Sequence, residues 1–170
     1  RQRQPLITLL VDFLQILNNE GWYDEAYHNK SEMIYILFGN MFEFISIDEP
    51  QKIRGRKRNI CFINEANELR YEDFFQLNIR TTNKIIIDYN PSDEHHWIYE
   101  RIIPRDDADF FISNYKDNPF LPESIIQAIE SYKEDDTDTW KIFGQGLRGK
   151  RQGLVFTNWK MARNKKDTQA

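Results

Sequence analysis

The chain has 170 residues, of which 40% are hydrophobic and 14% aromatic, and its formal net charge is −4. This composition excludes a chain that is disordered throughout, and the length is sufficient for a core that folds by itself. The single cysteine excludes a disulfide framework and a cysteine-based metal cluster, and no segment has the roughly 18 apolar residues of a membrane-spanning helix, so we expect a soluble protein in a reducing compartment.

The first 47 residues are predicted to form a helix and a β-hairpin. Apolar residues at helical spacing predict an amphipathic helix over Pro5–Glu20. Two β-rich runs follow, Glu32–Leu37 and Met41–Ile47, and between them Gly39-Asn40 is a hairpin-turn signal.

The next part of the chain is predicted to form a strand–helix–strand unit. Ile60–Ile63 and Lys84–Tyr89 are short apolar runs, typical of strands that are buried on both faces of a parallel sheet. Between them, Arg70–Ile79 is predicted to be a helix with Phe74, Phe75 and Ile79 facing inward. This order over about 30 residues predicts parallel pairing with a right-handed crossover.

The remaining elements are mostly helical. The predicted elements are a helix at Ser92–Ile103 capped by Ser92 or Asp93, a strand at Asp109–Asn114, helices at Glu123–Tyr132 and Asp136–Phe143, and a short strand at Leu154–Phe156. Trp97, Phe110 and Phe111 are predicted to lie in the core together with Phe74 and Phe75.

The most informative stretch is NICFINEANEL, Asn59–Leu69. Glu65 comes directly after a predicted strand, so its carboxylate should lie at the carboxyl edge of the sheet, where open α/β folds bind ligands. This is the geometry of a Walker B segment, whose acidic end serves magnesium and the attacking water in nucleotide hydrolysis. The alternative is a buried strand that runs into a solvated polar loop.

Two other groups of residues contain several side chains of the kinds that bind metals, but these side chains are not arranged as in a metal site. His95 and His96 are adjacent, so on a helix they point about 100° apart and cannot easily meet one ion. The acidic runs at 106–109 and 134–138 lack the glycine turn and final glutamate of a calcium loop. We therefore expect the histidines to be solvated residues at a helix start, and the acidic runs to have helix-cap and surface roles.

Four segments in a fixed order resemble the large terminase subunit of tailed bacteriophages, the DNA-packaging motor protein. They are KIRGRKRN, ICFINEANEL, IIIDYNPSDEHHWIYERI and YKDNPFLPESIIQAIE, and the later GQGLRGKRQGLVFTNW is similar to the passage between the ATPase and nuclease halves. Together they cover roughly residues 50–160. The resemblance implies an α/β, three-layer P-loop NTPase-like fold of the additional-strand, catalytic-glutamate type with a mainly parallel sheet. It also implies a partial ATPase domain at 1–146, and a linker with the first strand of an RNase H-like nuclease domain at 147–170.

The resemblance also implies roles for individual residues. Glu65 matches the glutamate that orients the attacking water, and Asn90 matches the residue that couples phosphate state to domain movement. Asn64 stands where many members carry an acid for magnesium, so it would reach the metal through water; a neutral amide is a weaker ligand for a hard cation than a carboxylate. ATP and Mg²⁺ are the implied cofactors of the complete protein.

The implied partners are double-stranded DNA, the portal protein, the small terminase subunit and other copies of the chain in a ring, without a membrane, in the cytoplasm of the bacterial host. The basic loop with Arg54, Arg56, Lys57 and Arg58 could contact DNA or a neighbouring subunit's nucleotide, or it could be a solvated loop. Residues 148–166, with seven basic side chains and no acidic one, could contact DNA or serve as a solubilising linker.

Two catalytic elements of the family do not occur in these 170 residues. No GxxxxGK[ST] phosphate loop is present, and Asp167 is the one acidic residue after Gly153, which is too few for a two-metal nuclease. We therefore expect an internal fragment that is inactive alone and binds neither ATP nor Mg²⁺ tightly. The alternative is a non-catalytic DNA- or portal-binding module that retains the fold.

Overall fold

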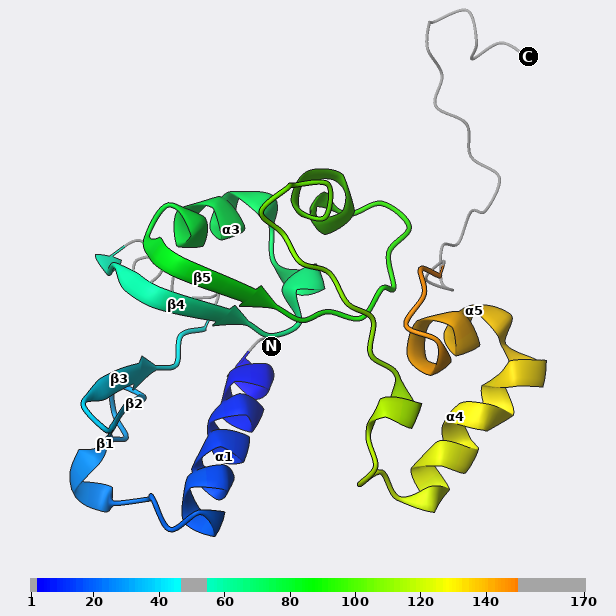
Figure 1. Cartoon of the computed structure of the whole chain (residues 1–170). Coiled ribbons are helices and arrows are strands. Elements are labelled where there is room, and N and C mark those ends of the chain that lie inside the picture. The colour runs from blue at the N-terminus through cyan, green and yellow to red at the C-terminus, as the bar shows by residue number, and fades with distance from the viewer. Residues whose placement is uncertain (1–2, 47–54, 150–170) are drawn as a thin grey trace, which may run out of the picture. The chain divides into compact units, whose positions relative to one another are not determined.

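The computed structural model describes residues 3–46 and 55–149, and the chain divides into two compact units, Arg1–Tyr89 and Asn90–Ala170 (Figure 1). Arg54, the predicted strand Leu154–Phe156 and most of the basic segment 148–166 lie outside the described residues.

The first unit begins with a helix and a small antiparallel sheet, as predicted. Helix α1 spans Arg3–Asn19. Strands β1 (His28–Asn29), β2 (Ile34–Leu37) and β3 (Asn40–Glu43) form a three-stranded sheet in the order β1-β2-β3. The two-residue β1 was not predicted, because so short a strand carries no alternating pattern.

The hairpin turn lies one residue earlier than predicted. Leu37 pairs with Asn40, so the turn residues are Phe38 and Gly39, with φ of 50° and 78°. Positive φ at both central positions is typical of the type I′ turn, which matches the twist of the flanking strands. Asn40 therefore belongs to β3, and its side-chain amide donates to the carbonyl of Phe38 at 3.3 Å.

An aromatic cluster joins α1 to this sheet. The ring centroid of Phe13 lies 5.9 Å from that of Tyr35, 5.1 Å from that of Phe42 and 5.3 Å from that of Phe44. Leu17 and Tyr35 are almost fully buried, with Tyr35 only 1% exposed. The Tyr35 hydroxyl donates to the carbonyl of Trp22 at 3.0 Å and accepts from the backbone N–H of Asp24 at 2.8 Å. Tyr35 thus connects the sheet to the loop that follows α1.

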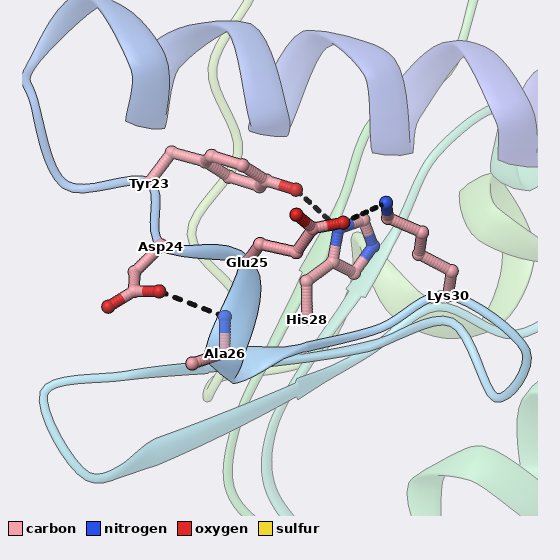
Figure 2. Close-up of polar contacts among 6 residues, drawn as sticks. All are labelled: Tyr23, Asp24, Glu25, Ala26, His28 and Lys30. Carbon is pink, nitrogen blue, oxygen red and sulfur yellow. Dashed lines mark hydrogen bonds and ion pairs between the residues drawn. The ribbon is translucent and has the colours of Figure 1, made fainter.

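Polar contacts close the loop between α1 and β1, as Figure 2 shows. Asp24 accepts from the N–H of Ala26 at 2.9 Å and so caps a 3₁₀ turn at Glu25–Tyr27. The Tyr23 hydroxyl lies 3.2 Å from His28 Nδ1, and Lys30 Nζ lies 2.6 Å from Glu25 Oε1. The hydrogen bond from Lys30 lowers the pKa of the Glu25 carboxyl, but because both groups are exposed this ion pair adds little stability.

The strand–helix–strand unit has the predicted topology. Strands β4 (Arg58–Ile63) and β5 (Thr81–Ile87) are parallel, with Cys61 opposite Ile85 and Ile63 opposite Ile87. Helix α3 (Tyr71–Asn78) connects them and lies along one face of the pair (Figure 1). Both strands begin two or three residues earlier than predicted.

The prediction that both strand faces are buried is wrong for the described part of the chain. Ile60 is 56% exposed, and Phe62 and Ile86 on the same face are also exposed. Ile63, which points to the opposite face, is buried. The described sheet has two strands and one connecting helix, so one face is covered and the other is open.

The inward face of α3 also differs from the prediction. Phe74 and Leu77 are buried, whereas Phe75 and Ile79 are exposed. Phe74 and Leu77 are three residues apart, so they lie on the same face of the helix, which is the buried face. Phe75 is rotated from Phe74 by about 100° around the helix axis and therefore points away from that face. The buried Asp73 receives a hydrogen bond from Arg70 Nε at 2.9 Å.

The second unit begins with less regular structure than predicted. Instead of the helix expected at Ser92–Ile103, the structure has a π-helical turn at Ile98–Ile102. The residue at its N-cap position is Trp97, not Ser92 or Asp93. The N–H of Ser92 donates to the carbonyl of Asn90 at 2.8 Å. The chain therefore turns tightly around Pro91 before the helix begins.

The strand predicted at Asp109–Asn114 is an extended segment without a strand partner among the described residues. Phe111 is 85% exposed and Phe110 is also exposed, so the prediction that they lie in the core is wrong for the described structure. An extended apolar sequence forms a strand only where a neighbouring strand offers hydrogen-bonding groups, and sequence pattern alone does not show whether one does.

A helical hairpin completes the second unit. Helix α4 (Glu123–Asp135) is followed by α5 (Thr137–Thr139) and a π-helical turn at Trp140–Gly144, close to the two predicted helices. Tyr115, in a 3₁₀ turn at Tyr115–Asp117, donates to Glu130 Oε1 at 2.7 Å and packs edge-on against Trp140. Tyr115 therefore connects α4 to the π-helical turn, and its hydrogen bond lowers the pKa of the Glu130 carboxyl.

Gly146→Ala is expected to destabilise the second unit by about 1–2 kcal/mol through backbone strain alone, because Gly146 has a left-handed φ of 66°. An added Cβ would also lie 2.6 Å from Ile112 Cγ2, which increases the loss. Gly21→Ala is the matched control, since Gly21 has a φ of 69° and an added Cβ there meets nothing within 4 Å. Urea titration of both variants measures the difference, and equal losses would contradict the steric part of the prediction.

Candidate active site

The candidate site lies where the two parallel strands end. Ile63 and Ile87 are paired, so the residues that follow them leave the sheet at the same edge. Asn64 and Glu65 follow β4, and Asp88 follows β5. The structure thus places Glu65 at the carboxyl edge, as the sequence predicted.

Backbone contacts continue past the ends of both strands. The N–H of Asp88 donates to the carbonyl of Ile63 at 3.0 Å, and the N–H of Ala66 donates to the carbonyl of Asp88 at 2.9 Å. Between them, the N–H of Glu65 donates to the Asp88 carboxylate, Oδ1, at 2.7 Å. The segments after β4 and β5 are therefore fixed to each other at Glu65.

The backbone of Glu65 has an unusual conformation, with φ of 54° and ψ of 48°. This left-handed region is disfavoured for residues that carry a Cβ, and residues held there cluster at functional sites. Glu65 also stands at the N-terminus of a 3₁₀ turn, Ala66–Glu68, whose first residue is fully buried. The chain therefore changes direction at Glu65, and the next residue, Ala66, is buried as the first residue of the 3₁₀ turn.

The side chains of Glu65 and Asp88 are exposed, and Asn64 is half-buried. An exposed carboxylate at a sheet edge can accept a proton from water or orient it for attack. The amide oxygen of Asn64 suits a hard cation as a ligand without charge. Among the described residues, no group of three or more His, Cys, Asp or Glu side chains could hold a metal ion.

The other predicted site residues fall into two sets. Asn90 comes three residues after the end of β5, is exposed and opens the second unit. In the basic loop, Arg56 forms an ion pair of 3.0 Å with the mostly buried Glu43, and Arg58 begins β4 and donates to the carbonyl of Arg56 at 3.1 Å. Lys57 is exposed. Arg56 and Arg58 therefore have structural contacts within the first unit.

The adjacent histidines do not form a metal site with other described residues. The ring of His96 lies 5.1 Å from that of Trp97, and its Nδ1 lies 3.4 Å from the N–H of Ile98, where the π-helical turn begins. His95 lines an open polar hollow of about 490 Å³ in the second unit. His95 is exposed and His96 is half-buried, just before the π-helical turn begins.

Sequence reasoning missed one residue of the site, Asp88. The signal was present, because Asp88 follows the apolar run Ile85–Ile87 as Asn64 and Glu65 follow Ile60–Ile63. The predicted strand extended to Tyr89 and so included Asp88, which hid its place at the edge.

Comparison with known families identifies the family of the chain that contains this sheet edge. The model of the phage terminase large subunit family matches residues 10–147. The chain belongs to this family. The match includes Glu65, Asp88 and Asn90, so the resemblance found in the sequence motifs is confirmed.

A curated terminase relative is similar to part of the chain. The PBSX phage terminase large subunit of Bacillus subtilis (strain 168) is 26% identical, over an alignment that covers 65% of this chain and 32% of that protein. The chain thus spans about a third of the length of this terminase. Within the described residues, no helix is sufficiently long and apolar to cross a membrane.

Proposed function

We propose that this chain is part of an ATP-driven motor that packages phage DNA into the prohead, and that Glu65 orients the attacking water. The observation that carries the proposal is the left-handed turn that holds Glu65 at the carboxyl edge of two parallel strands in a terminase chain. In nucleotide-hydrolysing α/β proteins, an acidic residue at this edge of the sheet lies next to the phosphate that water attacks.

The fold proposed around this site is a three-layer P-loop NTPase-like fold, in which β4 and β5 belong to a larger, mainly parallel sheet. The open face with Ile60, Phe62 and Ile86 supports this proposal, because parallel sheets are normally covered on both sides. We propose residues 1–146 as part of the ATPase domain, and residues 147–170 as a linker with the first strand of a nuclease domain.

The donor groups at the edge fit the acidic half of a magnesium–nucleotide site. Glu65 supplies an exposed carboxylate, and Asn64 supplies a neutral oxygen that would contact magnesium through water. The 170 residues contain no glycine-rich phosphate loop to hold the β- and γ-phosphates. When bound, magnesium neutralises charge on the phosphates, while Glu65 accepts a hydrogen bond from the attacking water.

Asn90 is the proposed coupling residue, because it lies three residues beyond β5, in the turn that opens the second unit. A change at the sheet edge would reach the second unit through this turn. The proposed partners are double-stranded DNA, the portal protein, the small terminase subunit and further copies in a ring, in the cytoplasm of the bacterial host. Among the described residues of the basic loop, Lys57 is the proposed DNA or subunit contact, since Arg56 and Arg58 have internal partners. Arg54, outside the described residues, stays a prediction from the sequence.

The 170-residue chain alone is expected to release no phosphate from ATP and to cut no DNA. Positioning and electrostatic stabilisation supply most of the catalysis in phosphoryl transfer, and these residues contain no phosphate loop. Phosphate release by the purified chain is compared with that of a heat-inactivated sample. Steady release above this control would contradict the prediction.

The test of the proposed function uses the full-length subunit, by which we mean a terminase large subunit of the family's length that contains these 170 residues. It should hydrolyse ATP and lose this activity when Glu65 is replaced. A full-length subunit that binds DNA or portal protein but has no ATPase activity would instead identify a non-catalytic binding module.

A further inference from the structure

We propose that Asp88 is a positioning residue for Glu65: its carboxylate holds the Glu65 backbone in the conformation that presents the catalytic side chain. The inference rests on the proposed function of Glu65 and adds a residue to it. Asp88 touches no reacting atom in this account and acts through its hydrogen bond to Glu65.

The contact is well suited to this role. Asp88 Oδ1 accepts the N–H of Glu65 at 2.7 Å, a short distance for an N–H donor and a carboxylate acceptor. Hydrogen bonds to an ionised acceptor are roughly twice as strong as neutral ones. The bond joins two residues that are 23 positions apart, one after each strand. It therefore fixes the exit of β4 to the exit of β5.

The conformation of Glu65 requires such support. A glutamate does not adopt φ of 54° and ψ of 48° without a cost, so surrounding contacts must hold it there. On one side, Asp88 N–H bonds to the carbonyl of Ile63 at 3.0 Å; on the other, the N–H of Ala66 bonds to the carbonyl of Asp88 at 2.9 Å. The carboxylate of Asp88 binds the N–H that lies between these two contacts.

Only one of these contacts depends on the Asp88 side chain. Both backbone bonds can form with any residue other than proline, which has no N–H, at position 88. The bond to the Glu65 N–H requires a side-chain oxygen at the right distance, which aspartate and asparagine supply and alanine does not. This difference allows the side-chain contact to be tested without removing the backbone contacts.

The experiment compares Asp88→Ala, Asp88→Asn, Glu65→Gln and the double variant Asp88→Ala/Glu65→Gln in the full-length subunit. Asp88→Ala is expected to lower kcat for ATP by about 10- to 100-fold with little change in KM, the scale of a displaced catalytic group. Asp88→Asn keeps an oxygen acceptor and should stay within about threefold of the parent, because a neutral hydrogen bond is weaker but present. Asp106→Ala removes another exposed aspartate and should leave kcat unchanged.

The double variant separates positioning from an independent effect. If Asp88 acts through Glu65, Asp88→Ala should lower the rate little further once Glu65 is glutamine, because residues that act as a unit are not additive. Hydrogen exchange of the peptide containing Glu65 and Ala66 gives a second readout. Exchange should be faster in Asp88→Ala than in the parent and nearly unchanged in Asp88→Asn.

Two results would overturn the inference while leaving the proposed function intact. One is a parental ATPase rate in Asp88→Ala when Glu65→Gln has lost activity. The other is a loss from Asp88→Ala that multiplies fully with the loss from Glu65→Gln. If Glu65→Gln itself turns over ATP at the parental rate, the proposed function fails and the inference fails with it.

Discussion

Glu65→Gln in the full-length subunit is expected to lower ATP turnover by on the order of 10²-fold or more, the usual scale for a positioned base. The amide preserves the shape of the side chain but loses the negative charge that we propose orients the attacking water. The fold and nucleotide binding should remain, because the Glu65 side chain is exposed and its structural contact is through the backbone N–H. Phosphate release and equilibrium binding of ATP measure the two effects separately.

Two neighbouring positions provide the controls for this result. Asn64→Ala should cost less than Glu65→Gln, because Asn64 contributes no charge to magnesium. Asn90→Ala should leave hydrolysis partly intact while reducing the amount of DNA packaged for each ATP, since its proposed role is coupling. A parental rate in Glu65→Gln would mean that β4 and the residues that follow it, Asn64 and Glu65, are structural and not a Walker B segment.

Tyr35→Ala is expected to destabilise the first unit by about 3–5 kcal/mol, as large aromatic truncations in a core do. Tyr35 is 1% exposed, and its ring packs against those of Phe13 and Tyr23. Its hydroxyl also forms hydrogen bonds with the carbonyl of Trp22 and the N–H of Asp24. The substitution therefore leaves a cavity and removes both hydrogen bonds, and urea titration followed by circular dichroism measures the loss.

Two further variants separate these contributions. Tyr35→Phe keeps the ring and should lose only about 0.5–1.5 kcal/mol for each hydrogen bond removed, because the Trp22 carbonyl and the Asp24 N–H belong to exposed residues that water can reach. Tyr27→Ala removes an exposed tyrosine from the same unit and should stay within about 0.5 kcal/mol of the parent. A similar loss in Tyr35→Ala and Tyr27→Ala would contradict the placement of Tyr35 in the core.

The topology of the first unit could be predicted because its signals are local. The helical spacing in α1, the glycine of the hairpin and the two apolar runs around α3 each identify an element within a few residues. Parallel pairing of β4 and β5 follows from the helix between them. The family was also recognisable, because four motifs occur in a characteristic order.

Burial and pairing could not be predicted in the same way, because they depend on what lies next to a segment. Ile60, Phe75 and Phe111 are apolar and were predicted to be buried, yet each is exposed in the described structure. Apolar character shows that a residue can be buried but does not identify the element that covers it. The helix expected from Ser92 begins only at Ile98, and the chain turns tightly at Pro91 before it.

The position of Glu65 at the sheet edge could be predicted from the sequence, but the contacts around it could not. A carboxylate directly after an apolar run indicates a residue at the end of a strand. The left-handed backbone of Glu65 and its hydrogen bond to Asp88 are not readable in this way. They arise from the register in which β4 and β5 pair, which brings residues 23 positions apart within hydrogen-bonding distance.

The most direct test of the central claim is a structure of the full-length subunit with Mg²⁺ and a non-hydrolysable ATP analogue. We expect the γ-phosphate to lie at the carboxyl edge of β4 and β5. A Glu65 carboxylate oxygen should then be about 3 Å from a water in line with that phosphate, the reach of a general base. A nucleotide bound away from this edge, or a Glu65 carboxylate that does not contact the attacking water, would contradict the account.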